Sequence, residues 1–357
     1  MRLAVRHRTS YRYSQSVSQS INQLCLLPPS DRRQRCLASR VTVQPEPESI
    51  RFGTDCYGNR IAHFGLFVPH RLCHVTVTSE VETNETLAPL PRSLGRDENR
   101  ARLSRRGDPD ALMAHDCLLP SPYVPPGSAA ETLLDECPPT GLGVLEYAGR
   151  LMTHIHRSFR YDAKFSSLVT PIDDVVAARR GVCQDFAHLA IAALRRAGIP
   201  ARYVSGYLET LPPPGRAKLR GADASHAWFS VYDAAGGWHD FDPTNDRRPD
   251  AQYVVTARGR DYGDVTPLKG IVYGGGRHRL SVEVDVDRVV PEDRDGGDDR
   301  DALAANDADT AAGARAAPST SSRPDGHGDG EPRAPSSSPP GSSPDTLVPR
   351  PRARRDA

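Results

Sequence analysis

Several features that would place this chain in a familiar class are missing from its 357 residues. Its seven cysteines are widely spaced and form no Cys-x-x-Cys, which argues against a disulfide framework and a structural zinc ribbon. No uninterrupted apolar run of about 18 residues is available to span a membrane. The basic start, Met1 to Arg8, is not followed by the apolar stretch of a secretory signal. We therefore expect a cytoplasmic protein with no membrane partner.

An excess of charge of one sign is also missing. Lys and Arg number 46 against 45 Asp and Glu, for a net charge of +1, so nucleic acid is not an expected partner. Hydrophobic residues make up 38% of the chain, beside 32 Pro and 29 Gly, so a core is available and loops are plentiful. The length allows two domains and a tail.

Residues 1–90 have the pattern of an all-β region. Short stretches of alternating apolar and polar residues are separated by Pro, Gly, Asn and Asp turn signals. Strands of this length and spacing predict a small β-sandwich. The expected strands are Leu3–His7, Ser18–Leu26, Ala38–Val43, Asn59–Phe67 and Cys73–Val81.

The rest of the chain divides into a connector, a second domain and a tail. Residues 91–115 are polar and arginine-rich, as in a connector. Residues 116–290 place helical stripes first and strands after them, which predicts an α+β domain. Its expected strands are 202–208, 226–232, 238–242 and 280–286. Residues 291–357 hold too little apolar surface to offset the entropy of ordering, so we expect a disordered tail.

Cys183 stands at the predicted start of an amphipathic helix, directly after Gly181 and Val182. From Phe186 onward the small and apolar residues recur with the spacing of one helix face, until Gly198 and Pro200 end the helix. A thiol in the first turn of a helix lies near the positive end of the helix dipole, which stabilises a thiolate. The position suits a nucleophile, although a buried structural cysteine is the plainer interpretation of Cys183 alone.

A thiol nucleophile needs a base, and a third group that orients the base. His226 begins one predicted strand and Asp242 ends the next, with a short turn at 233–237 between them. If Tyr232 pairs with Trp238 across that turn, His226 and Asp242 become diagonal neighbours on one face of the sheet. The residues therefore predict a group of Cys183, His226 and Asp242.

Three ordered blocks now resemble a known family, the bacterial transglutaminase-like superfamily. They are Gly181 to His188, Ala224 to Trp228 and Gly237 to Asn245. The first region is similar to the β-rich part that often precedes this core, and the resemblance covers residues 1–290. It implies a papain-like α+β core with Cys183 as nucleophile, His226 as base and Asp242 as orienting carboxylate. The implied chemistry is attack on an amide carbonyl of a protein or peptide, with a thioester intermediate. Calcium sites like those of some crosslinking members of this superfamily are not found in the sequence, and we expect no cofactor or metal.

Other residues compete for parts of this assignment. Asp240 lies two residues before Asp242 and points to the same face of a regular strand, so it is a rival partner for His226. His188 falls off the apolar stripe and is expected to pack or to face solvent. A zinc site built from Cys183, His188, His154 or His156 lacks recognisable ligand spacing. The acidic start of the tail is unlike a calcium loop.

Two questions stay open in the sequence. The second donor of an oxyanion hole could be Tyr161, Trp228 or Gln184 beside the Cys183 backbone, and the loop Leu211–Ala222 either borders a substrate cleft or is a plain connector. The function is either a thiol enzyme acting on amides, as a peptidase, amidase or transglutaminase, or a catalytically idle binding or scaffold protein. Oligomeric state cannot be predicted.

Overall fold

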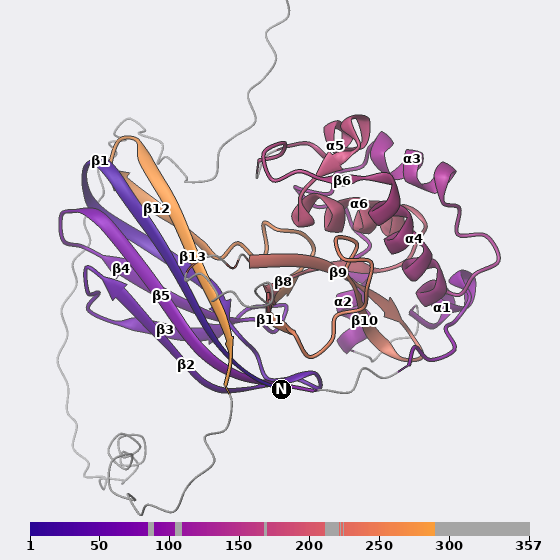
Figure 1. Ribbon diagram of the computed structural model, residues 1–357, viewed down its shortest axis with the longest axis horizontal. Coiled ribbons are helices and arrows are strands. Elements are labelled where there is room, and N and C mark those ends of the chain that lie inside the picture. The colour runs from indigo at the N-terminus through magenta and orange to yellow at the C-terminus, as the bar shows by residue number, and fades with distance from the viewer. Residues whose placement is uncertain are drawn as a thin grey trace, which may run out of the picture. The chain divides into compact units, whose positions relative to one another are not determined.

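The computed structural model describes residues 1–84, 89–103, 109–167, 170–210, 221, 223 and 225–289 (Figure 1). These residues belong to one compact unit. The predicted tail at 291–357, and the predicted loop Leu211–Ala222 apart from Gly221, lie outside the described residues.

A sheet of seven strands is formed by the first part of the chain together with its last described strands. Strand β1 is long because residues 2–27 contain no Gly or Pro to interrupt it. Its first half pairs with β5 and β13, and its second half pairs with β4 and β12. The seven strands are β1 (Arg2–Leu27), β2 (Gln34–Gln44), β3 (Ile50–Thr54), β4 (Arg60–Leu66), β5 (His70–Thr83), β12 (Leu268–Gly274) and β13 (His278–Arg288).

One expectation about this region needs correction. The β-rich character is confirmed, and β1 links the strands of both halves because it runs through both. The strand expected at 280–286 forms within β13, yet it pairs with β1 and not with the strands of the second region. The alternating residues Val284 and Val286 are buried on the inner face of the first sheet.

The predicted helices of the second region are present. Helix α4 (Val144–Ser158) buries Leu145, Ala148, Leu151 and Ile155, and α6 (Cys183–Arg196) is the central helix of the main core. Helix α4 follows the predicted apolar stripe, with one face packed inward. Helix α6 is buried on all sides from Asp185 to Arg195, which is more than the single apolar face that its sequence predicted. Around them lie α3 (Ser128–Glu136) and α5 (Ile172–Ala178). The predicted connector contains two further short helices, α1 (Arg96–Leu103) and α2 (Pro109–Asp116).

A four-stranded antiparallel sheet packs against α6 (Figure 1). Its order is β10–β9–β8–β11, so β11 is an edge strand that was not among the predicted ones. The strands are β8 (Ala201–Leu208), β9 (Ser225–Asp233), β10 (Gly237–Phe241) and β11 (Tyr253–Gly259). One face meets α6 through Tyr203 and Phe229, and the other buries Val204, Trp228, Tyr253 and Val255. A short parallel pair, β6 (Arg160–Tyr161) and β7 (Arg180–Gly181), leads into α6.

The fold class predicted from the sequence, α+β with a β-rich N-terminal region, is confirmed. The boundaries expected between domains at residues 90, 115 and 290 stay predictions.

Candidate active site

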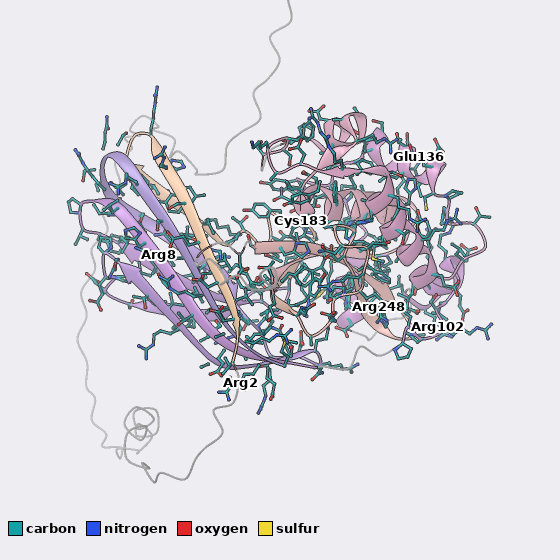
Figure 2. The ribbon with its side chains drawn as sticks, viewed as in Figure 1. Arg2, Arg8, Arg102, Glu136, Cys183 and Arg248 are labelled. Carbon is teal, nitrogen blue, oxygen red and sulfur yellow. The ribbon has the colours of Figure 1, made fainter. Side chains whose placement is uncertain are left out.

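Cys183 is the first residue of α6 and is partly buried (Figure 2). The chain reaches it through a tight turn, in which a Cβ on Gly181 would lie 2.8 Å from a carboxylate oxygen of Asp185. That carboxylate accepts a hydrogen bond of 2.8 Å from Val182 N, which closes the first turn of the helix. The Cys183 backbone N–H lies in this turn, where N–H groups have no acceptor within the helix.

His226 lies at the start of β9 and is joined to Asp242. Its Nε2 donates to Asp242 Oδ2 at 2.7 Å. The predicted register is confirmed, since Tyr232 pairs with Trp238 and Phe229 with Phe241 across the turn. In this register His226 and Asp242 are neighbours across the two chain segments, as the sequence predicted.

Cys183 acts on the same imidazole, since its side chain is one of the groups that raise the pKa of His226. Burial alone would lower the pKa of His226. The hydrogen bonds to Asp242 and Cys183 and the charges of both groups outweigh burial and raise that pKa to about 10. The ring therefore holds a proton at neutral pH.

Asp242 is fully buried and accepts hydrogen bonds on both oxygens. Its Oδ2 accepts from Tyr253 Oη at 2.6 Å and Asn245 Nδ2 at 2.7 Å, in addition to His226. Its Oδ1 accepts from Thr244 N at 2.8 Å and Asn245 N at 3.3 Å. Burial would raise the pKa of Asp242, but the hydrogen bond and charge of His226, with those of Tyr253 and Asn245, hold it below its usual value. Asp242 is therefore a fixed anion.

The rival carboxylate, Asp240, is engaged elsewhere. Its Oδ2 accepts a hydrogen bond of 2.6 Å from Arg33 Nη1, and the same guanidinium donates to Pro249 O at 2.6 Å. Asp240 lies on β10 and Asp242 directly follows its last residue, Phe241, so the alternation of the strand points both carboxylates to one face. Of the two, Asp242 is the one that contacts His226.

Tyr253 is a site residue that the sequence reasoning missed. It begins β11, donates to Asp242, and packs edge-on against Trp228 with ring centroids 5.3 Å apart. The run Tyr253-Val254-Val255-Thr256 is rich in β-formers and could have indicated the strand. Its closeness to Asp242 could not be predicted, because β8 rather than β10 is its hydrogen-bonded neighbour.

The three nominal oxyanion donors occupy different places. Tyr161 is 53% exposed and pairs with Gly181 across β6 and β7. Burial of part of its ring raises the pKa of Tyr161, with further contributions from the charges of Cys183 and Asp185. The pairing with Gly181 places Tyr161 near the start of α6. Trp228 is fully buried beside His226, with ring centroids 6.0 Å apart. Gln184 is partly exposed in the first turn of α6.

His188 packs inside the protein, one of the two outcomes expected for it. Its Nε2 accepts from Tyr262 N at 3.2 Å, and its ring stacks on Tyr123 at 5.6 Å between centroids. Burial lowers the pKa of His188 to about 3, with a smaller effect from Arg195. The ring is neutral at ordinary pH and ties α6 to the loop that contains Tyr262.

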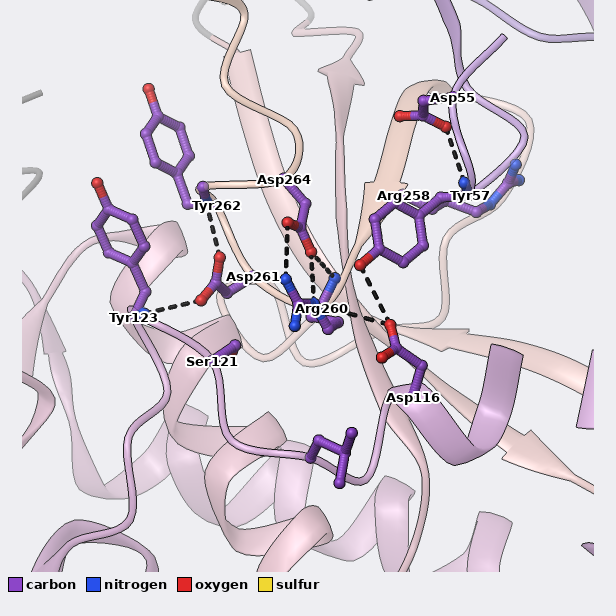
Figure 3. A network of polar contacts seen from close by, with 12 residues as sticks. Asp55, Tyr57, Asp116, Ser121, Tyr123, Arg258, Arg260, Asp261, Tyr262 and Asp264 are labelled. Atoms are coloured by element: carbon purple, nitrogen blue, oxygen red, sulfur yellow. Dashed lines mark hydrogen bonds and ion pairs between the residues drawn. The ribbon is translucent and has the colours of Figure 1, made fainter. Parts of the chain in front are cut away.

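The loop that contributes Tyr262 N is held by a network of carboxylates (Figure 3). Asp261 Oδ2 accepts from Tyr123 N at 2.7 Å, and Arg260 Nε donates to Asp264 at 3.0 Å. Among the described residues, no group of three or more His, Cys, Asp or Glu side chains could hold a metal ion. No helix in the same part of the chain is long and apolar enough to cross a membrane.

Comparison with known families finds two matches along the chain. Residues 3–82 match the bacterial transglutaminase-like N-terminal region, and residues 132–243 match the transglutaminase-like superfamily. The second match includes Cys183, His226 and Asp242. The resemblance stated from the sequence is thereby confirmed.

Individual proteins extend this likeness. An uncharacterized protein of Mycobacterium tuberculosis is 39% identical over 314 residues, which cover 82% of this chain and 94% of that protein. The crystal structure of a candidate cysteine protease from Cytophaga hutchinsonii is 22% identical with a TM-score of 0.63, covers 82% of this chain and 92% of that one, and shows the same fold. A protein-glutamine gamma-glutamyltransferase of Pseudomonas aeruginosa is 34% identical over 106 residues, 29% of this chain and 16% of that protein.

Proposed function

The chain belongs to the bacterial transglutaminase-like superfamily, and from that premise we propose that it is a thiol-dependent enzyme acting on amide carbonyls of proteins or peptides. The observation that carries the proposal is the hydrogen bond of 2.7 Å from His226 to the buried Asp242, with the Cys183 side chain close enough to the same imidazole to raise its pKa. In the proposal Cys183 is the nucleophile, His226 the base and Asp242 the group that orients His226.

In the first half of the reaction the Cys183 thiolate attacks the carbonyl carbon of the amide. A carbon–sulfur bond forms, and the carbonyl oxygen becomes an oxyanion. The carbon–nitrogen bond then breaks, and the leaving amine takes the proton of the His226 imidazolium. The products are a thioester on Cys183 and a neutral imidazole, whose orientation is kept by Asp242.

In the second half an amine or a water molecule attacks the thioester and gives a proton to His226. The carbon–sulfur bond breaks, and the thiolate and imidazolium are restored. An amine yields a new amide and water yields an acid. The Pseudomonas relative is named for transfer to an amine, which makes amine transfer to a glutamine carboxamide the first reaction to test.

For the oxyanion we propose the Cys183 backbone N–H and the Tyr161 hydroxyl as donors. Tyr161 is the candidate that is both near the thiol and open to a substrate, since its ring is half exposed. Trp228 is less suitable because it is fully buried beside His226. A donor of this kind contributes about 10²–10³ in kcat.

Alkylation by iodoacetamide tests the nucleophile without a substrate. Cys56 is exposed and gives an internal reference on the same chain. Because His226 keeps its proton, we expect Cys183 to react faster than Cys56 below pH 7, with the advantage lost in His226→Gln. Equal rates for the two cysteines across pH 5–9 would refute the nucleophile assignment and favour a binding or scaffold role.

Substrates are then tested with a glutamine-containing protein, with and without a dansylated primary amine. Incorporation of the amine with ammonia release indicates transfer, ammonia alone indicates deamidation, and new N-termini indicate peptide cleavage. All three should disappear in Cys183→Ala. The cytoplasmic location stays part of the proposal and is checked by cell fractionation.

A further inference from the structure

Strand β11 forms the edge of the four-stranded sheet, so one row of its backbone groups faces away from β8. Val255 and Arg258 contribute such groups. Along a regular strand, the backbone groups of successive residues point alternately to the two edges. Val255 and Arg258 are three residues apart, so their backbone groups share an edge only because the strand is irregular. The pairing with β8 shifts register between Val255 and Ala257, which turns both toward the first sheet region.

Gln34 occupies the first of these positions. Its Nε2 donates to Val255 O at 2.8 Å, and Val255 N donates to its Oε1 at 2.8 Å. The Gln34 side chain thus pairs with β11 as a neighbouring strand would. It is 3% exposed, and Nε2 makes a second hydrogen bond, to Pro29 O at 2.8 Å.

Asn59 occupies the second position in the same way. Its Nδ2 donates to Arg258 O at 2.6 Å, and Arg258 N donates to its Oδ1 at 2.7 Å. Asn59 is 1% exposed. Two amide side chains from the first region therefore replace a missing strand at the edge of the second sheet.

Each of these two residues is held by an aspartate in its own turn, Gln34 through its backbone N–H and Asn59 through both its backbone N–H and its side-chain amide. Asp31 Oδ1 accepts from Arg33 N at 2.8 Å and from Gln34 N at 3.1 Å. Asp55 accepts from Tyr57 N, drawn in Figure 3, and from both N and Nδ2 of Asn59, each at 2.9 Å. The turns are therefore organised to present these amides, which reduces the entropy lost on pairing.

The pairing with Gln34 lies two residues from Tyr253, whose hydroxyl donates to Asp242. Arg33 of the same turn donates to Asp240 on β10, the strand that directly precedes Asp242. One turn of the first region thus contacts both strands whose ends meet at the orienting carboxylate. A shift of β11 along its edge would move the Tyr253 hydroxyl away from Asp242.

We propose that Gln34 is a positioning residue for the Cys183–His226–Asp242 group, acting through β11 and Tyr253. Asn59 anchors the far end of β11, so that the strand is fixed at two points. The inference rests on the proposed function, because it assigns the first region a part in setting the geometry of that site. The first region is then a component of the catalytic site rather than a separate binding module.

The test replaces Gln34 by methionine, which keeps its length and removes both hydrogen-bonding groups. Gln19→Met is the matched control, since Gln19 is exposed on β1. In Gln34→Met we expect a folded chain in which Cys183 is alkylated about tenfold more slowly at pH 6, while Cys56 is unchanged. NMR titration of the His226 ring should show its proton lost at lower pH than in the parent chain.

Coupling to Tyr253 separates positioning from general destabilisation. In a Tyr253→Phe background, Gln34→Met should cause little further change, because the route through the Tyr253 hydroxyl is already lost. Independent, additive effects would overturn the proposal, as would an unchanged titration of His226 in folded Gln34→Met. Should Gln34→Met fail to fold, Gln34→Asn, whose amide is one carbon short of both groups, replaces it.

The His226 titration also separates the two claims. A parent chain in which Cys183 and Cys56 react equally refutes the thiol-enzyme proposal, whatever Gln34 does. A shift of the His226 titration in Gln34→Met would still report positioning in that case. A reactive Cys183 with no effect of Gln34 refutes the positioning role alone.

Discussion

Replacing Asp242 by asparagine tests how the buried carboxylate is satisfied. Five donors point at its two oxygens, two of them at Oδ1 and three at Oδ2. An asparagine has one oxygen, so its NH₂ group must face donors at one of the two positions. Fewer hydrogen bonds are lost if the NH₂ group takes the place of Oδ1. In that orientation the backbone N–H groups of Thr244 and Asn245 lose their acceptor.

The expected destabilisation follows from that count. A buried donor left without an acceptor costs about 1–3 kcal/mol, so two such donors cost about 2–6 kcal/mol. Because this turn is only partly buried, we expect the free energy of unfolding to fall by about 2–3 kcal/mol, the lower part of that range. Urea unfolding at pH 6 measures the difference in free energy. The control is Asp97→Asn, whose carboxylate is 95% exposed and should change stability little.

The stability of the folded protein should fall both at acid pH and at alkaline pH. The pKa of Asp242 is lowered in the folded protein, so its stabilisation is present above the unfolded value of about 3.9 and is lost as pH falls. The pKa of His226 is raised to about 10, so its stabilisation is complete below the unfolded value of about 6.5 and is lost as pH rises toward 10. The free energy of unfolding of the parent chain should therefore exceed that of Asp242→Asn by the largest amount between about pH 4 and 6.5. A gap that stays constant from pH 4 to 10, or equal urea midpoints for the two asparagine variants, contradicts the reasoning.

Three shorter predictions follow. In Gly206→Ala the new Cβ would overlap the carbonyl oxygen of Val254, and because backbone cannot move aside as a side chain does, we expect a loss of about 2–3 kcal/mol in urea unfolding; a loss below 0.5 kcal/mol would count against the packing described. The buried His188 accepts from Tyr262 N and should stay neutral, so its NMR signals should not move between pH 5 and 8, and a titration there would show that the ring is not buried. Tyr161→Phe should lower kcat about 10²-fold with little change in KM, whereas an unchanged kcat would remove the hydroxyl from the oxyanion site.

The His226–Asp242 contact could be predicted from sequence because it is local. The two strands are joined by a short turn, and pairing Tyr232 with Trp238 fixes which residues meet further along. The helix of Cys183 was predictable for a similar reason, since its apolar spacing and its Gly and Pro stops lie within one stretch.

Long-range contacts could not be predicted in this way. Tyr253 reaches Asp242 although its strand lies at the opposite edge of the sheet from β10. Gln34 pairs with Val255 through an amide, and a single glutamine in a turn carries no sequence signal for such a partner. The place of β13 was missed because its alternation predicts a strand but does not say which strand it pairs with.

The long first strand makes assembly depend on the order of synthesis. Leu3 pairs with Arg288, so β1 has neither β12 nor β13 beside it until almost all of the described chain has been made. At about 5–20 residues per second the ribosome needs tens of seconds to supply them. During that time one edge of β1 is open to pairing with other nascent chains, and contacts of such large sequence separation also form slowly. Yield in cells should therefore depend on translation speed and chaperone supply more than the native contacts alone would suggest.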